Sequence, residues 1–176
     1  EYRRKLLEKQ PRMLAVLNLA AEKAGWGKPL PAGRFRGIAV VSNIGSFNAQ
    51  VAEVSVTGGK VKVHKVTCAV DCGVVVNPAI VAQQIESGIV YGLGPALKHG
   101  ITLDKGRVTN TNFNSYDPTR IDETPEIEVH IVPSTAAPGG TGEASTPTTP
   151  PAVLNAVYAA TKKRIRVLPA LQKDLA

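Results

Sequence analysis

The sequence predicts one α+β domain in which helices pack on a mainly antiparallel sheet. Two hairpin signals and three helical patterns support this fold class, and a chain of 176 residues with 43% hydrophobic composition can bury one substantial core. We expect the central sheet to come from residues 37–71 and 100–132. We expect helices at residues 12–24, 78–94 and 151–161 to pack against it.

Strand patterns fill the middle of the chain. The stretches IAVVSNIGSF, AQVAEVSV and KVKVHKVTCAV follow one another, and Gly58-Gly59 between the last two favours a tight hairpin because both positions tolerate positive φ. A second hairpin is expected to turn at Asp104-Lys105-Gly106. The stretch PEIEVHIV then alternates apolar and polar residues, as a strand with one buried face does.

Helix signals flank these strands. The stretch PRMLAVLNLAAEKA begins with a proline and runs into Gly25, a common helix stop. A second helix is expected to begin after Asn77, a suitable N-cap, with Pro78 at its first position. The last helix is expected to start near Pro151, and the basic, partly apolar KKRIRVLP closes the chain as strand or coil.

Glycines mark the second of these helices. Gly88 and Gly92 lie four residues apart on one face, and Gly94-Pro95 should end or distort the helix. Each glycine costs a helix about 1 kcal/mol relative to alanine, so we expect something to approach that face closely. Spacing alone favours another helix or a strand as the neighbour, and a ligand is the alternative.

The positive charge is concentrated at the N-terminus. Residues 1–36 hold nine Lys and Arg against three Glu, whereas the rest of the chain holds twelve against eleven acids. Few aromatic residues lie among these cations, so a basic nucleic-acid-binding module is only a remote alternative. No apolar run approaches the roughly 20 residues that cross a bilayer, and the start has no signal-peptide pattern. We therefore expect a soluble chain without a membrane span.

The chain has two cysteines, Cys68 and Cys72. Three residues separate them, which is not the CxxC spacing of a redox motif or zinc site, and strand alternation would point both to one face. We expect two half-buried free thiols rather than a disulfide.

One carboxylate stands alone near the C-terminus. Within residues 129–161, Glu143 is the only formally charged residue, and it directly follows the stretch APGGTG. A linker is the simplest interpretation of such a composition. However, a strand pattern precedes this loop and a helix pattern follows it, which favours an ordered loop within one domain. If the loop packs inward, Glu143 would lie in apolar surroundings that suit a general base, and the glycines would let the backbone approach a cofactor.

Four stretches form a recognisable set of motifs: VDCGVVVNP, QQIESGIVYGLGPAL, TNFNSYDPTRIDETPEIEVHIVPS and PGGTGEASTPTTPPAVLNAVYAATKKRIRVLP. Together they resemble the molybdenum hydroxylases, the xanthine dehydrogenase and aldehyde oxidase family, whose C-terminal Gly-x-Gly-Glu turn carries the active-site glutamate. RMLAVLNLAAEKAGWGKPLPAGRFRGIAV extends the likeness toward the N-terminus. The resemblance covers nearly the whole chain. It is closest to the large, molybdopterin-binding subunit of the isoquinoline 1-oxidoreductase and bacterial aldehyde dehydrogenase branch.

The resemblance implies roles for particular residues. Glu143 would be the general base, taking a proton from the hydroxide that attacks an electrophilic carbon of the substrate. Gln84 would lie near the pterin and the metal, and Gly140, Thr141 and Gly142 would bring the backbone up to the cofactor. No side chain of this chain would ligate the metal, because in the family the dithiolene of the pterin holds it.

Two residues depart from the family pattern. Ser87 stands where a glycine is common, and Tyr91 stands where a second glutamine often precedes Gly-Leu-Gly. The serine is a small change. The tyrosine would either reshape a pocket wall or face away from it.

The resemblance also implies a larger assembly. Residues 1–36 would be an N-terminal helical segment and connection, and residues 37–176 a portion of the molybdopterin-binding domain. A molybdopterin cytosine dinucleotide would be shared with the remainder of the large subunit, and a small partner subunit would carry two iron–sulfur clusters. The substrate would be an N-heteroaromatic compound or an aldehyde, and the compartment a bacterial cytoplasm or periplasm. The isolated chain is expected to be inactive, and an inert fragment that holds part of the cofactor groove is the alternative.

Overall fold

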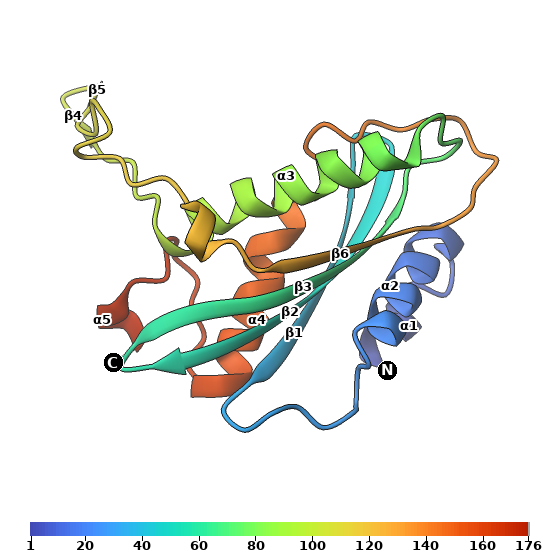
Figure 1. Cartoon of the computed structure of the whole chain (residues 1–176), viewed down its shortest axis with the longest axis horizontal. Helices are drawn as coiled ribbons and strands as arrows, with labels where there is room; N and C mark the ends of the chain where they lie inside the picture. The colour runs from blue at the N-terminus through green and yellow to red at the C-terminus, as the bar shows by residue number, and fades with distance from the viewer. Residues whose placement is uncertain (176) are drawn as a thin grey trace.

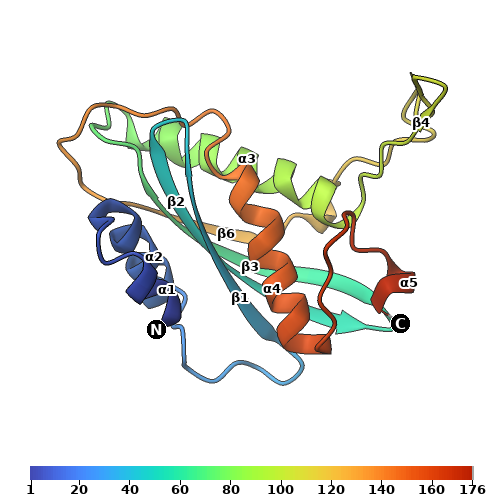
Figure 2. The same cartoon turned by 180° about the vertical axis from the view of Figure 1, so that it is seen from behind.

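The computed structural model describes residues 1–175, and Figures 1 and 2 show it from opposite sides. Its helices are α1 (Tyr2–Leu6), α2 (Pro11–Lys23), α3 (Pro78–Leu97), α4 (Thr149–Thr161) and α5 (Gln172–Leu175). Its strands are β1 (Phe35–Asn43), β2 (Ser46–Thr57), β3 (Lys60–Asp71), β4 (Leu103–Asp104), β5 (Arg107–Val108) and β6 (Glu126–Ile131). Two short 3-10 turns precede β6 and α4: η1 (Ile121–Glu123) and η2 (Thr146–Thr148).

The main sheet has the strand order β1-β2-β3-β6. β1, β2 and β3 form the predicted antiparallel meander, and the hairpin at Gly58-Gly59 pairs Thr57 with Lys60. β6 then lies beside β3 in parallel, with Val66 opposite Ile127. In the described chain the sheet is therefore mainly antiparallel, which confirms the predicted fold class.

The helices cover the two faces of this sheet. α3 and α4 share one face, where Ile85 and Ile89 of α3 and Val153 and Val157 of α4 are fully buried against the strands. Figure 2 shows α4 lying across β1 and β2. α2 packs on the opposite face with Val16 buried, so the apolar stripe of this helix closes a second, smaller core.

Part of the segment that was expected to widen the sheet forms an arm instead. The second hairpin turns where predicted and pairs Leu103 with Val108, but β4 and β5 make a separate two-stranded sheet that projects from the body (Figure 1). Of the predicted residues 100–132, the main sheet takes only 126–131. Strands of two residues with exposed side chains bury too little apolar surface to join a core.

α3 also differs from the prediction, because it continues through Gly94-Pro95 to Leu97. Pro95 removes one helical hydrogen bond and crowds the carbonyl four residues before it, and the helix ends two residues later, within the same turn. The helix closes when Lys98 N and His99 N both donate to the carbonyl of Gly94, at 2.7 and 2.8 Å. The His99 ring fills the space beside Gly94 that a Cβ would occupy.

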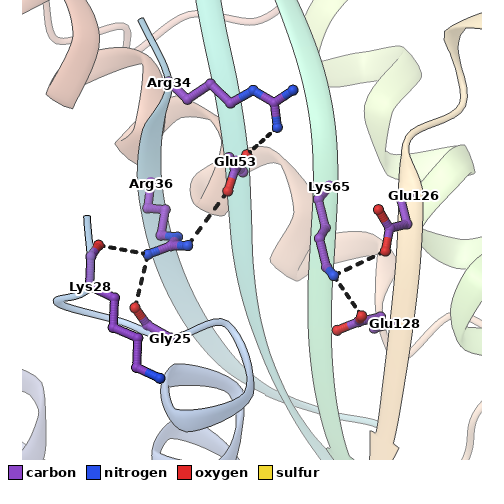
Figure 3. A network of polar contacts seen from close by, with 8 residues as sticks. All are labelled: Gly25, Lys28, Arg34, Arg36, Glu53, Lys65, Glu126 and Glu128. Atoms are coloured by element: carbon purple, nitrogen blue, oxygen red, sulfur yellow. Dashed lines mark hydrogen bonds and ion pairs between the residues drawn. The ribbon is translucent and has the colours of Figure 1, made fainter. Parts of the chain in front are cut away.

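A row of alternating charges crosses the sheet on the face that carries α2 (Figure 3). Arg36 of β1 stands opposite Glu53 of β2, Glu53 opposite Lys65 of β3, and Lys65 opposite Glu126 of β6. Arg36 Nη2 lies 3.7 Å from Glu53 Oε2, and Lys65 Nζ lies 3.0 Å from Glu126 Oε1. The ion pairs thus link β1 with β2 and β3 with β6, and each charge of the row has an opposite charge as its cross-strand neighbour.

Candidate functional site

Glu143 lies in the loop between β6 and α4. Hydrogen bonds hold the first half of this loop to the end of the sheet. Gly139 N donates to the carbonyl of Cys72 at 2.8 Å, and Gly140 N donates to the carbonyl of Ile44 at 2.8 Å. The hydroxyl of Ser46 donates to the carbonyl of Gly140 at 2.7 Å. These bonds fix the loop against both the β1–β2 turn and the end of β3, so it is ordered and not a linker.

The close packing of this half involves two of the loop glycines. A Cβ on Gly139 would lie 2.5 Å from the carbonyl oxygen of Gly45, and one on Gly140 would lie 2.7 Å from Ile44 Cδ1. The backbone of the β1–β2 turn therefore requires glycine at position 139, whereas at position 140 the contact is with the flexible end of the Ile44 side chain. Gly142 differs, because a Cβ there would meet nothing within 4 Å.

The second half of the loop is held to α3. Ser145 is buried and its hydroxyl donates to the carbonyl of Ile85 at 2.8 Å, while the hydroxyl of Thr146 donates to the carbonyl of Gly88 at 3.1 Å. A Cβ on Gly88 would lie 2.2 Å from Ser145 Oγ. The close neighbour expected from the helix glycines is thus protein: this loop together with the start of α4.

A buried polar network continues from the loop into the sheet. Gln50 of β2 donates from Nε2 to the carbonyl of Ser145 at 2.8 Å and to Asn48 Oδ1 at 3.1 Å. The hydroxyl of Thr149 donates to Gln50 Oε1 at 2.9 Å. Asn48 Nδ2 in turn donates to the thiol sulfur of Cys68 at 3.0 Å. Gln50 of β2 and Thr149 of α4 thereby bond the loop two residues after Glu143, and Asn48 extends the network to β3.

Glu143 itself lies between the two anchored halves, and its side chain is exposed. The expectation that it lies in apolar surroundings is therefore wrong for the described chain. Within residues 1–175 Glu143 has no side-chain hydrogen bond or ion pair. A short, exposed peptide between two fixed points consequently presents a free carboxylate.

The other predicted site residues lie on the same side of the molecule. Gln84 is exposed on α3, one residue before Ile85, whose carbonyl accepts the Ser145 hydroxyl. That bond brings the helix segment of Gln84 and the loop of Glu143 together. Thr141 is half-buried and Gly142 is exposed, directly before Glu143.

The two departures from the family pattern are also on this surface of α3. Ser87 and Tyr91 are exposed, at three and seven residues after Gln84, so all three share one helical stripe. The Tyr91 side chain is 66% exposed and does not enter the core.

The cysteines beneath this surface are free and buried, not half-buried as predicted. Burial raises the pKa of the Cys68 thiol to about 12 and also raises that of Cys72. Thiols this difficult to ionise are poor nucleophiles and poor metal ligands. They belong to the core.

A metal-binding cluster and a membrane-spanning helix are both absent from residues 1–175. Over residues 1–175, His, Cys, Asp and Glu side chains nowhere gather in threes that could hold a metal ion. In the same residues, no helix has the length and apolar character needed to cross a membrane. Ion pairs neutralise part of the N-terminal positive charge: Arg12 pairs with Asp71, and Glu53 pairs with both Arg34 and Arg36. This pairing weakens the nucleic-acid alternative.

The fold of this chain matches part of the fold of oxidoreductases whose structures have been solved. The crystal structure of quinoline 2-oxidoreductase from Pseudomonas putida 86 aligns with a TM-score of 0.67 and 24% identity, over 73% of this chain and 18% of that chain. The molybdopterin cofactor-binding domain family matches residues 23–125, more than half of the chain. The chain belongs to this family. The matched residues include Gln84 and end before Glu143.

Two curated relatives extend the similarity over almost the whole chain. Membrane-bound aldehyde dehydrogenase [pyrroloquinoline-quinone] of Gluconacetobacter polyoxogenes is 34% identical over 93% of this chain. Isoquinoline 1-oxidoreductase subunit beta of Brevundimonas diminuta is 32% identical over 96% of it. The chain spans 22% of the length of each. The resemblance to the molybdenum hydroxylases is therefore confirmed.

Sequence reasoning missed the polar network of Gln50, Asn48, Ser145 and Thr149. A signal was present, because the stretch FNAQVAEV places Asn48 and Gln50 on the same face as apolar core residues. The loop and α4 partners of Gln50, Ser145 and Thr149, lie about a hundred residues away in the chain. Only the tertiary structure identifies them.

Proposed function

We propose that the chain is part of a molybdenum-dependent oxidoreductase that hydroxylates N-heteroaromatic compounds or oxidises aldehydes, with Glu143 as general base. The observation that carries this proposal is the anchored loop, which presents the exposed Glu143 two residues before Ser145, whose hydroxyl is bonded to Ile85, the residue next to Gln84. A flexible tether would not need bonds to the β1–β2 turn, β3, β2 and α3. Family membership supports the molybdopterin cofactor. The names of the two curated relatives, an aldehyde dehydrogenase and an isoquinoline 1-oxidoreductase, support the substrate classes.

The exposed groups fit a molybdopterin as neighbours and not as metal ligands. Gln84 offers an amide that can donate and accept, Thr141 a hydroxyl, and Gly142 a backbone with open space beside it. We propose that Gln84, Gly140, Thr141 and Gly142 border a molybdopterin cytosine dinucleotide. When bound, this cofactor supplies the molybdenum centre that takes up two electrons as the substrate carbon is oxidised.

The protein's part in the reaction is proton transfer and orientation. Glu143 accepts a proton at a carboxylate oxygen from the oxygen nucleophile that attacks the substrate carbon. The bonds on both sides of Glu143 limit how far the carboxylate can move, which keeps it in reach of that proton. Gln84 orients polar groups of the cofactor without adding charge.

The site is open on one side, so other protein must complete it. Glu143, Gln84 and Tyr91 are exposed, whereas a cofactor or substrate site buries most of its ligand. We propose that the remainder of a large subunit covers this surface and that a small subunit with two iron–sulfur clusters accepts the electrons. The limited share of the curated relatives that this chain spans supports such an assembly.

Glu143→Gln in the assembled enzyme tests the base. The amide has the same shape, so we expect unchanged molybdenum content and folding. Turnover should fall by about 10² to 10⁴-fold, equivalent to about 3 to 5 kcal/mol of barrier. Turnover number and bound molybdenum are measured on the same preparation, and Glu8→Gln, at an exposed position outside the site, serves as the matched control.

The competing interpretation makes an opposite prediction. If Glu143 is an ordinary loop residue, the Gln variant keeps its turnover within about threefold of wild type, because surface substitutions change stability and rate very little. A molybdenum-loaded Glu143→Gln enzyme with that activity contradicts the assignment.

A further inference from the structure

We propose that Gln50 is a positioning residue that sets the location of the Glu143 carboxylate. This inference rests on the proposed role of Glu143, although its structural part can be tested separately. Gln50 does not reach the reacting atoms. It acts through the main chain of Ser145, which lies two residues after Glu143.

Each polar atom of the Gln50 amide has a defined partner. Nε2 donates its two hydrogens to the carbonyl of Ser145 and to Asn48 Oδ1, and Oε1 accepts from the hydroxyl of Thr149. The side chain is fully buried, with 0% of its surface exposed. Rotating the amide by half a turn would set Oε1 against two acceptors, the carbonyl of Ser145 and Asn48 Oδ1, so a single orientation is favoured.

The network is anchored on the side away from the loop. Asn48 lies two residues before Gln50 on the same face of β2 and donates to the sulfur of Cys68 on β3. Gln50 is therefore fixed by two central strands of the sheet, whose pairing is continuous at this point. A rigid sheet thus determines where the carbonyl of Ser145 can lie.

A short hydrogen-bonded turn connects the Ser145 carbonyl to Glu143. Thr146 N donates to the carbonyl of Glu143 at 3.2 Å, which closes a tight turn that includes Ser145. The Ser145 hydroxyl is simultaneously bound to Ile85 of α3. A displacement of the Ser145 carbonyl must therefore move the turn that begins at Glu143.

A buried glutamine is a costly choice for packing alone. The next inward positions of β2 toward its end, Ala52 and Val54, are apolar, and a buried amide is tolerated only when it is fully hydrogen-bonded. An aliphatic side chain would fill the site, but it would leave the carbonyl of Ser145 with Thr149 alone as a side-chain donor. The benefit of the amide is a defined position for the loop, and misplacement of a catalytic group by about 1 Å can cost about 100-fold in rate.

The experiment compares Gln50→Leu, Glu143→Gln and the double variant in the assembled enzyme. Val54→Ala is the control for general destabilisation, because Val54 is a buried residue of β2 in the same core. Hydrogen exchange reports the amides of Thr146 and Thr148, which are bonded within the loop. Turnover number, KM and molybdenum content are measured in parallel.

A positioning role predicts a specific pattern. Gln50→Leu should increase exchange at Thr146 and Thr148 and lower the turnover number about 10 to 100-fold, with molybdenum content and KM nearly unchanged. Val54→Ala should leave exchange at these amides as in wild type. In the Glu143→Gln background, Gln50→Leu should cause no further loss, because both changes act on one group.

The outcomes separate the two proposals. If exchange at Thr146 and Thr148 is unchanged by Gln50→Leu, or if the two losses of turnover multiply, the positioning role is overturned. If Glu143→Gln is fully active, the proposed base is wrong, while exchange still decides whether Gln50 holds the loop. Should Gln50→Leu fail to fold, Thr149→Val replaces it, because that near-isosteric change releases Gln50 Oε1 and predicts the same exchange pattern.

Discussion

At the residue scale, Asp71 shows how one ion pair fixes the end of a strand beside the site. Arg12 of α2 donates from Nε and Nη2 to the two carboxylate oxygens at 2.8 and 2.7 Å, and Gly73 N donates to Asp71 Oδ1 at 3.0 Å. The Asp71 side chain is only 3% exposed. These bonds, and above all those from Arg12, hold the pKa of the Asp71 carboxyl below its usual range.

The lowered pKa gives a pH-dependent contribution to stability. Because the folded chain binds this proton less readily than the unfolded chain, the contribution is complete above the unfolded pKa of about 3.9. It is lost as pH falls through the lower, folded pKa. Lysine neighbours also lower the pKa of three other carboxyls, through Lys98 at Asp117 and Glu123 and through Lys65 at Glu128. These three side chains are more exposed than that of Asp71.

We therefore predict that Asp71→Asn destabilises the chain at pH 7 by about 2 kcal/mol, the usual range for hydrogen bonds to a charged group. The difference from wild type should shrink as the pH is lowered from about 4 to about 2. Urea unfolding at each pH measures it. A difference that stays constant over this range, or is absent at pH 7, contradicts the account of Asp71.

At the scale of elements, α3 is shaped to receive the loop. Gly92 lies where a Cβ would be 2.8 Å from both the carbonyl oxygen of Thr146 and Thr149 Cβ. Those atoms belong to η2 and the first turn of α4, so they cannot move without disturbing both elements. Glycine at this position lowers the helix propensity of α3 relative to alanine, but it allows the close contact with η2 and α4.

Gly92→Ala should consequently destabilise the chain although alanine is the better helix former. The gain in propensity is about 1 kcal/mol, and overpacking of a close contact costs about 1 to 3 kcal/mol, so we expect a net loss of about 1 kcal/mol. Ser87→Ala on the exposed stripe of the same helix is the matched control and should be neutral or slightly stabilising. Urea midpoints of the two variants are compared. A Gly92→Ala chain more stable than wild type would show that α3 and the loop are not closely packed.

Local sequence signals were sufficient for the meander, the Gly58-Gly59 hairpin and, within two residues, the starts of the three long helices, because each depends on residues close together in the chain. The short helices α1 and α5 were not predicted. The parallel addition of β6 to β3 was not accessible from such signals, since it pairs Lys65 with Glu126 across sixty-one positions. The same limit applies to the site. The glycine-rich loop and its carboxylate were visible in the sequence, whereas the exposure of Glu143 and its support by Gln50 depend on tertiary packing.

At the scale of the whole molecule, much apolar surface remains uncovered. The segment that connects α3 to β6, part of which forms the projecting arm, carries Phe113, which is 80% exposed, and Ile121 of η1, which is 94% exposed. Apolar side chains this exposed gain free energy when another surface covers them. Together with the open side of the candidate site, they support the proposal that further protein packs on this chain.

This openness leads to a prediction for the chain purified alone. One side of a groove cannot bury most of a large cofactor, so we expect residues 1–176 to fold but to retain no molybdenum and to show no turnover. Metal analysis and an activity assay measure both quantities, and the same chain within the assembled large subunit is the control. Stoichiometric molybdenum with turnover in the isolated chain would contradict the prediction. It would mean that the surface around Glu143 and Gln84 encloses its cofactor without help from other segments.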